Sequence, residues 1–130
     1  MSSPKQKLIA YRLQRAREAL GDAESDIEQE RLNSAANRIY YAMFYAAIAL
    51  LATRDLSSSR HSGAIGLFYR HFVQSGDFPP ELAQHLGRAL EMRTNTDYKD
   101  FSVPDSVKVR EEFEHARSFV QKVEELIRAA

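Results

Sequence analysis

Apolar residues recur at helical spacing along almost the whole chain. Between residues 4 and 30 they step by three or four positions, which predicts one long amphipathic helix. The same stepping predicts a third helix over 59–75, capped by Ser59, a fourth that opens at 79–80, and a last one that opens at 104–105. No convincing strand pattern appears. We therefore expect an all-α antiparallel up-and-down bundle of four main helices plus a shorter one.

The stretch 33–51 predicts the central helix, because it is apolar nearly all round. One of its faces is nonetheless polar. This face carries Ser34, Asn37, Arg38, Tyr41 and Tyr45. Buried donors and charges cost several kcal/mol unless they are partnered. The rest of the chain must therefore supply acceptors and counter-charges to this face, or enclose a ligand there.

A second polar group ends the fourth helix. Arg93 takes the next position on an otherwise apolar stripe, with Asp97 one turn further and Tyr98 beside it. The polar residues of both groups have structural interpretations as well as a functional one. Arg38 and Asp97 can form a buried ion pair that fixes helix register, or Arg93 can pair with Asp97 on its own helix. The central tyrosines can be core residues whose hydroxyls reach a carbonyl or water.

The four histidines give weaker evidence for a functional site than these two polar groups do. His61 lies in the first turn of the third helix, where it can cap, pack or serve as a ligand or catalytic group. We expect His71, His85 and His115 at the surface or at the rim of the bundle. No two histidines have metal-ligand spacing with a carboxylate, so we expect no metal site and no cofactor.

Composition narrows the class of protein. The 130 residues fit one domain over 1–130, and the absence of cysteine agrees with a reducing cytoplasm. The N-terminus lacks the apolar run of a signal peptide, and tyrosines break the central apolar stretch, so we expect a core helix and no membrane span. With 18 basic and 18 acidic residues, general polyanion binding is disfavoured, while a local phosphate pocket is compatible with the charge.

The central stretch resembles a known family. Residues 36–47, ANRIYYAMFYAA, are similar to the central helix of small prokaryotic HEPN (higher eukaryote and prokaryote nucleotide-binding) proteins. The similarity continues in Arg60-His61-Ser62-Gly63, in Leu67-Phe68, in Phe72-Val73 before Gly76, and in Arg93 followed by Asp97-Tyr98. It covers nearly the whole chain, and it implies the same helical bundle.

The resemblance also implies partners. Members of the family are frequently homodimers, and many are encoded beside a minimal nucleotidyltransferase. Several members are metal-independent ribonucleases that act as toxins. We expect a homodimer here, with the exposed flanks of Phe68, Tyr69 and Phe72 as its seam.

The nuclease motif of the family is incomplete in this chain. Catalytic members carry an arginine and, after a short gap, a histidine; the histidine handles the ribose 2′-hydroxyl proton while the arginine stabilises phosphate charge. Arg93 fits the first position, but Tyr98 stands where the histidine is expected. A tyrosine with a pKa near 10 is a poor general base at neutral pH. Some members are silenced by nucleotidyl transfer to a tyrosine two residues further; Asp100 is there instead, so that modification is not expected.

Three hypotheses follow. The first is a noncatalytic domain that binds a nucleotide or RNA phosphate. Its ligand-binding residues are Asn37, Arg38, Tyr41, Arg93 and Asp97, with Tyr98 at the edge of the same pocket. The second is a metal-independent ribonuclease toxin in which Arg93 acts with His61 or Tyr98. The third is a purely structural, partner-binding bundle in which these groups satisfy each other.

Overall fold

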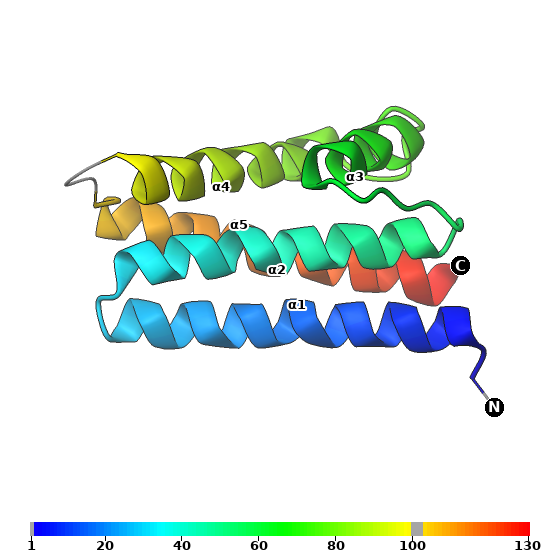
Figure 1. Cartoon of the computed structure of the whole chain (residues 1–130), viewed down its shortest axis with the longest axis horizontal. Coiled ribbons are helices and arrows are strands. Elements are labelled where there is room, and N and C mark those ends of the chain that lie inside the picture. Colours follow the sequence, from blue (N-terminus) through cyan, green and yellow to red (C-terminus); the bar gives the residue numbers. More distant parts are fainter. Residues whose placement is uncertain (1, 100–102) are drawn as a thin grey trace.

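Five α-helices and one π-helical turn follow each other in the computed structural model, which describes residues 2–99 and 103–130. They are α1 (Pro4–Glu28), α2 (Leu32–Ala52), α3 (His61–Phe68), η1 (Tyr69–Val73), α4 (Pro80–Tyr98) and α5 (Ser106–Ala129). Within the described residues there is no strand, so the all-α prediction is confirmed. Figure 1 shows α1 alongside α2, with α3 and α4 on the other side of α2 and α5 behind it.

Helix α2 is the core of the bundle. It packs against α1, α3, α4 and α5, and the side chains of Ile39, Tyr40 and Met43 are completely buried. Among the described helices it alone has the length and hydropathy to cross a membrane, but 72% of the apolar window lies inside the bundle. Its apolar character is therefore explained by its central position among the other helices.

The apolar stripes of α1 and α5 face this core, as their periodicity predicts. On α1 the alanines Ala16, Ala19 and Ala23 are at most 2% exposed, which lets its backbone lie close to α2. On α5 the stripe buries Val109, Phe113, Ala116, Val120 and Val123. Two long helices with matched stripes thus enclose the central one.

Local capping explains where two of the helices begin. At the start of α1, Ser3 Oγ accepts from the Gln6 amide at 3.1 Å, and the Gln6 side chain accepts from the Ser3 amide at 2.9 Å. Asp105 caps α5 by accepting from the Val107 amide at 2.7 Å. The prediction that Ser59 caps the third helix is wrong, because Arg60 holds the N-cap position without a side-chain cap.

The third predicted helix divides in two. The α-helical part ends at Phe68, and a π-helical turn carries the chain to Val73. Gly76 then reverses the chain in the left-handed conformation, with φ 90°, which glycine adopts without strain. The prediction that the flanks of Phe68 and Phe72 form an exposed seam is wrong. Both are buried, because the Phe68 ring packs on Phe78 at 5.1 Å and they close one end of the core. Tyr69 is half-buried, and its hydroxyl donates to the Ala83 carbonyl at 2.9 Å.

Candidate functional site

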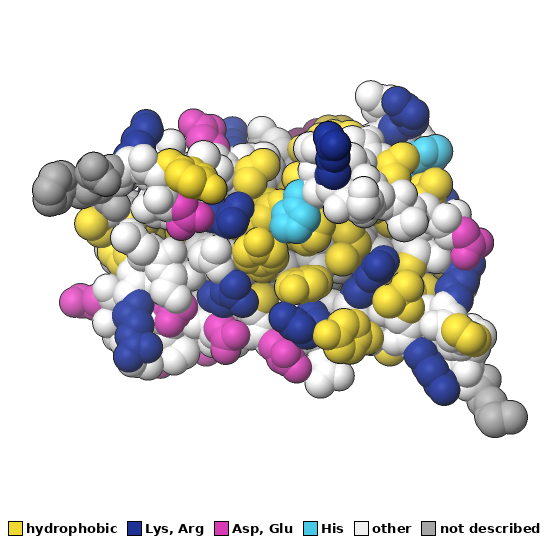
Figure 2. Space-filling view, viewed as in Figure 1, with side chains coloured by type: hydrophobic (Ala, Val, Ile, Leu, Met, Phe, Trp, Pro, Cys, Tyr) yellow, Lys and Arg dark blue, Asp and Glu magenta, His cyan; other side chains and the backbone are white. Residues whose placement is uncertain are grey.

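The polar face of α2 meets arginines from both neighbouring helices. We name this region the Tyr–Arg surface; it consists of Arg15 on α1, Arg38, Tyr41 and Tyr45 on α2, and Arg93 on α4. All five residues are partly exposed. Figure 2 shows a hydrophobic patch at the centre of this face, with Lys and Arg side chains around it and a histidine at its edge.

Two guanidinium groups lie against one tyrosine ring. The Cζ atom of Arg38 is 5.2 Å from the Tyr41 ring centroid, and that of Arg93 is 5.3 Å from it. Arg93 also lies 5.5 Å from the centroid of Tyr40. Each distance falls within the range of a cation–π interaction, which holds the cations in place without neutralising their charge. The ring therefore positions two positive charges at the surface.

Arg38 does not pair with Asp97, so that predicted ion pair is not formed. Its Nε instead donates to Oδ1 of the adjacent Asn37 at 3.0 Å. The amide is neutral, so the Arg38 charge is oriented but not cancelled. Asn37 thus acts on the site by fixing the direction of the Arg38 fork.

Arg93 pairs with Asp97 on its own helix, which is one of the predicted alternatives. The Arg93 Nε lies 3.5 Å from Asp97 Oδ2, and the two side chains are 24% and 37% exposed. The contact lacks hydrogen-bond geometry. Among the described residues, the buried Nε therefore has no hydrogen-bond partner. Buried donors normally have an acceptor, so this orphaned donor needs an explanation.

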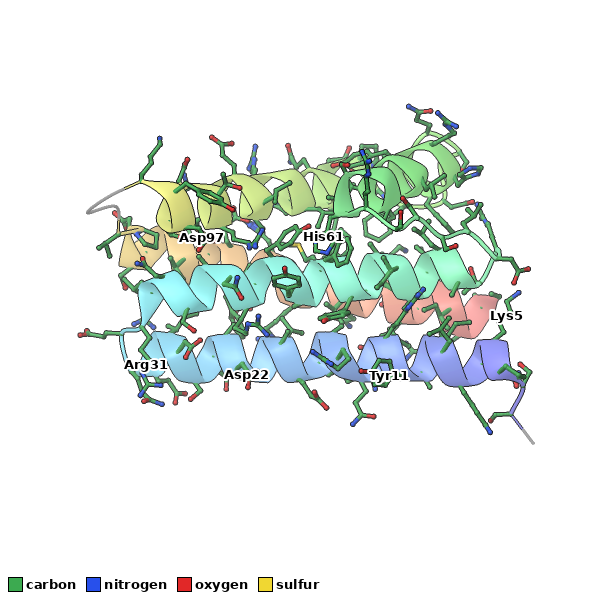
Figure 3. All side chains as sticks on the ribbon, in the orientation of Figure 1. Lys5, Tyr11, Asp22, Arg31, His61 and Asp97 are labelled. Carbon is green, nitrogen blue, oxygen red and sulfur yellow. The ribbon has the colours of Figure 1, made fainter. Side chains whose placement is uncertain are left out.

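His61 reaches the same tyrosines from α3. Its ring stacks on Phe44 at 4.1 Å, its Nδ1 lies 3.3 Å from the Tyr40 hydroxyl, and its ring centroid is 5.8 Å from that of Tyr41. Figure 3 shows His61 and Asp97 on the side of α3 and α4 that faces α2, at different points along the bundle. His61 and Arg93 thus lie around one tyrosine ring, with His61 exposed to solvent.

The buried Tyr40 is held in its neutral form. Burial, and secondarily the nearby Tyr41, raise the pKa of Tyr40 to about 12, while the positive charge of Arg93 opposes the shift. At neutral pH this phenol keeps its proton. It can therefore donate to the imidazole of His61 and cannot serve as a base.

Arg15 was not predicted as part of the site. Its Nη2 donates to the Tyr45 hydroxyl at 3.2 Å, and its Cζ lies 5.0 Å from that ring centroid. The neighbouring Arg12, one turn earlier, donates to the Ile48 carbonyl at 2.9 Å. A pair of arginines beside the apolar stripe of α1 was the available sequence signal, because such residues lie at the edge of the helix contact.

Tyr98 is separate from these contacts. It is 79% exposed at the last residue of α4 and takes part in none of the ring, ion-pair or hydrogen-bond contacts that join the described residues of the Tyr–Arg surface. Asp100, the position of the family's modified tyrosine, lies outside the described residues. Of the predicted proton-transfer groups, only His61 lies beside the tyrosines that hold Arg93.

A second polar cluster lies between α4 and α5. The prediction that His85 lies at the surface or at the rim of the bundle is wrong: it is 7% exposed, and its ring stacks on that of His115 at 3.7 Å. Glu112, 6% exposed, contacts both: its Oε2 lies 3.4 Å from His85 Nδ1, and its Oε1 lies 3.6 Å from His115 Nδ1. The spacing Glu112-x-x-His115, which places both on one helix face, was the missed sequence signal.

A groove on the described part of the molecule lies beside this second cluster, and Tyr41 is not among the residues that line it. It encloses about 790 Å³ between the end of α4 and the start of α5. Its lining includes Arg88, Glu91, Lys108, Glu112 and His115. Cavity size alone would favour this groove as the ligand site, whereas three arginines gather on the Tyr–Arg surface. Arg93 and Arg15 each have a carboxylate nearby, Asp97 at 3.5 Å and Glu18 at 3.9 Å, while Arg38 has none among the described residues. For an anionic ligand the charge is decisive.

Comparisons with known proteins agree on a family. The sequence profile of the HEPN domain matches residues 9–129. A UPF0332 protein of Thermotoga maritima is 42% identical over 95% of this chain and 93% of its own length. A UPF0332 protein of Archaeoglobus fulgidus is 29% identical over 92% of this chain and 94% of its own. A Methanocaldococcus jannaschii protein named "Putative toxin MJ0142" is 31% identical over 66% of this chain and 58% of its own.

Proposed function

This chain belongs to the HEPN domain family, and we propose that it is a cytoplasmic, noncatalytic component of a toxin–antitoxin-like or nucleotidyltransferase-associated module that binds a nucleotide or RNA phosphate on its Tyr–Arg surface. The toxin name of a relative supports the module, and the placement of the arginines supports the ligand. Its partners would be a second copy of the chain and a minimal nucleotidyltransferase.

One observation carries the proposal. The half-buried Tyr41 ring holds the guanidinium groups of Arg38 and Arg93 at 5.2 and 5.3 Å, and Asp97 is the one carboxylate that pairs with either among the described residues. A phosphate could meet both forks, and it could accept from the orphaned Nε of Arg93 once Asp97 turns outward. Tyr41 and Tyr45 are partly exposed, so their rings could offer stacking surfaces for bases.

The purely structural alternative is less well supported. It requires every polar group of the surface to be satisfied internally and closed to solvent. Arg93 Nε is buried without a hydrogen bond, and Tyr41, Tyr45 and Arg38 remain partly exposed. These groups are better explained as a surface that awaits an anion.

The test is calorimetric titration of the purified chain with ribonucleotides and short single-stranded RNA. We expect Arg93→Gln to weaken binding by roughly tenfold or more, since a charged hydrogen bond contributes about 1.5–3 kcal/mol. Arg117→Gln is the matched control, because Arg117 is exposed on α5 and pairs with Glu114. Absence of heat with every ribonucleotide and RNA would contradict the proposal.

A ribonuclease activity is the second candidate function. It is favoured by the position of His61, whose ring lies 5.8 Å from the Tyr41 ring that also contacts Arg93. Here the imidazole would take the 2′-hydroxyl proton and Arg93 would stabilise the phosphate charge. Cleavage of labelled RNA in the presence of chelator, lost in both Arg93→Gln and His61→Ala, would replace the noncatalytic proposal with this one.

A further inference from the structure

The cluster between α4 and α5 has the composition of a metal site. His85 projects from α4, while Glu112 and His115 project from neighbouring turns of α5. One ligand atom from each residue can be chosen so that all three lie within 4.8 Å of one another. Two imidazoles and a carboxylate are a donor set that binds divalent transition metals and leaves a coordination position open.

The ligand atoms are buried and unpaired. His85 Nδ1, His115 Nδ1 and Glu112 Oε2 each have no hydrogen-bond partner within the described residues. His85 and Glu112 are more than nine-tenths buried, at 7% and 6% exposure. Their contacts with one another, at 3.4 and 3.6 Å, lack hydrogen-bond geometry, and buried polar atoms without a hydrogen bond are costly. A cation bound between them would satisfy all three.

The distances place all three groups within reach of one ion. Zinc bonds to histidine nitrogen and carboxylate oxygen are about 2.0–2.2 Å, so ligand atoms on one tetrahedral zinc lie roughly 3.3–3.6 Å apart. Glu112 Oε2 lies 3.4 Å from His85 Nδ1, and the other oxygen, Oε1, lies 3.6 Å from His115 Nδ1. The two rings stack nearly parallel, at 18°, with centroids 3.7 Å apart, so their in-plane lone pairs do not yet point at one ion. Binding would therefore require the half-exposed His115 ring to turn toward Glu112.

Access is also suitable. Glu112 and His115 line the open groove, so an ion could enter from solvent and keep a water in its fourth position.

We propose that His85, Glu112 and His115 form a binding site for one divalent transition-metal ion, with Zn²⁺ as the best match. The site joins α4 to α5 and is built from residues outside the Tyr–Arg surface. It is therefore independent of the nucleotide-binding proposal and would stabilise the packing of these two helices.

The test uses the full chain after treatment with chelator and buffer exchange. Added Co²⁺ should give the intense visible absorption of four-coordinate cobalt at one ion per chain, and Zn²⁺ should abolish it by displacement. Zn²⁺ should also raise the melting temperature. His115→Ala should weaken binding by at least about 100-fold; because this side chain is 43% exposed, the variant should retain the wild-type circular dichroism spectrum. Glu112→Gln should have a comparable effect.

His71→Ala is the matched control, since it removes a histidine of the π-helical turn outside the cluster. It should bind Co²⁺ and Zn²⁺ like the wild type. The proposal is overturned if the wild type gives no cobalt absorption and no thermal shift. It is also overturned if His71→Ala weakens binding as much as His115→Ala, or if His115→Ala binds normally.

Discussion

The Nδ1 atom of His61 lies 3.3 Å from the hydroxyl of Tyr40, joining the start of α3 to the buried centre of α2. The two residues are 21 positions apart, and one is exposed while the other is completely buried. A solvent-facing imidazole is thus connected to the core through one phenol. The protonation state of that phenol should affect the stability of the whole bundle.

Tyr40 should make the fold sensitive to alkali. Its pKa is raised to about 12 in the folded chain, above the value near 10 of an unfolded tyrosine. This contribution to stability is complete below pH 10 and is lost as the pH rises toward 12, because the unfolded chain releases the proton first. Between pH 10 and pH 12, the loss of this contribution should reduce the free energy of unfolding by about 1.4 kcal/mol per pH unit.

Urea unfolding of wild type and Tyr40→Phe at several alkaline pH values checks this expectation. The variant should lose stability less steeply with pH, although it should be about 0.5–1.5 kcal/mol less stable at neutral pH without the hydrogen bond. Tyr69, whose pKa is also raised by burial, is present in both proteins and cancels. Equal slopes for the two proteins would contradict the assignment to Tyr40.

Tyr41 should contribute to RNA binding through its ring and not through its hydroxyl. Tyr41→Ala removes both the stacking surface and the support of Arg38 and Arg93, so we expect single-stranded RNA to bind about 1–3 kcal/mol more weakly. Tyr41→Phe keeps the ring and should bind within about twofold of the wild type. Fluorescence anisotropy with a labelled oligonucleotide compares the three proteins. Loss of binding in the phenylalanine variant would show that the hydroxyl is the contact.

The fold could be predicted because the apolar period within each helix follows from burial. The stripes of α1 and α5 face the core as expected, and Gly76 takes its left-handed conformation because the chain must reverse there. The π-helical turn could not be predicted, because it depends on how the rings around Phe68 fill the end of the bundle. Local spacing does not contain that information.

The candidate site could be predicted only in part, for a related reason. Residues on one helix, such as Arg93 and Asp97, are placed together by the helical repeat alone. Contacts between helices depend on the rotation of each helix about its axis, which the packing of many side chains decides. Spacing within α1 can place Arg15 at the edge of a helix contact, but it cannot identify Tyr45, 30 positions away, as the partner. Nor can it pair His85 with Glu112 on another helix.

The cap of α5 should be a local source of stability. Asp105 accepts from the amides of Val107 and Lys108, at 2.7 and 3.3 Å, which satisfies donors that the first turn cannot. Asp105→Ala should therefore lower the free energy of unfolding by about 1 kcal/mol in urea denaturation. Asp22→Ala removes the same charge from an exposed position within α1, and it should change stability by less than about 0.5 kcal/mol. Equal effects would point to overall charge and not to the cap.

We still expect a homodimer, with its seam at a different place from the buried Phe68 and Phe72. Exposed apolar side chains gather where α4 ends and α5 begins: Tyr98 is 79% exposed, and Val107 is 64% exposed. Light scattering should give twice the chain mass of 14.8 kDa at micromolar concentration. Val107→Glu should shift that mass toward one chain, because a charge cannot be buried unpaired in an interface.

Leu8→Glu is the control for this substitution. Leu8 is 42% exposed near the start of α1, at the end of the bundle opposite the junction of α4 and α5 (Figure 1). The same added charge there should leave the dimer intact. A one-chain mass for the wild type would contradict the dimer itself. A dimer that tolerates Val107→Glu but dissociates with Leu8→Glu would instead place the seam at the end where α1 begins.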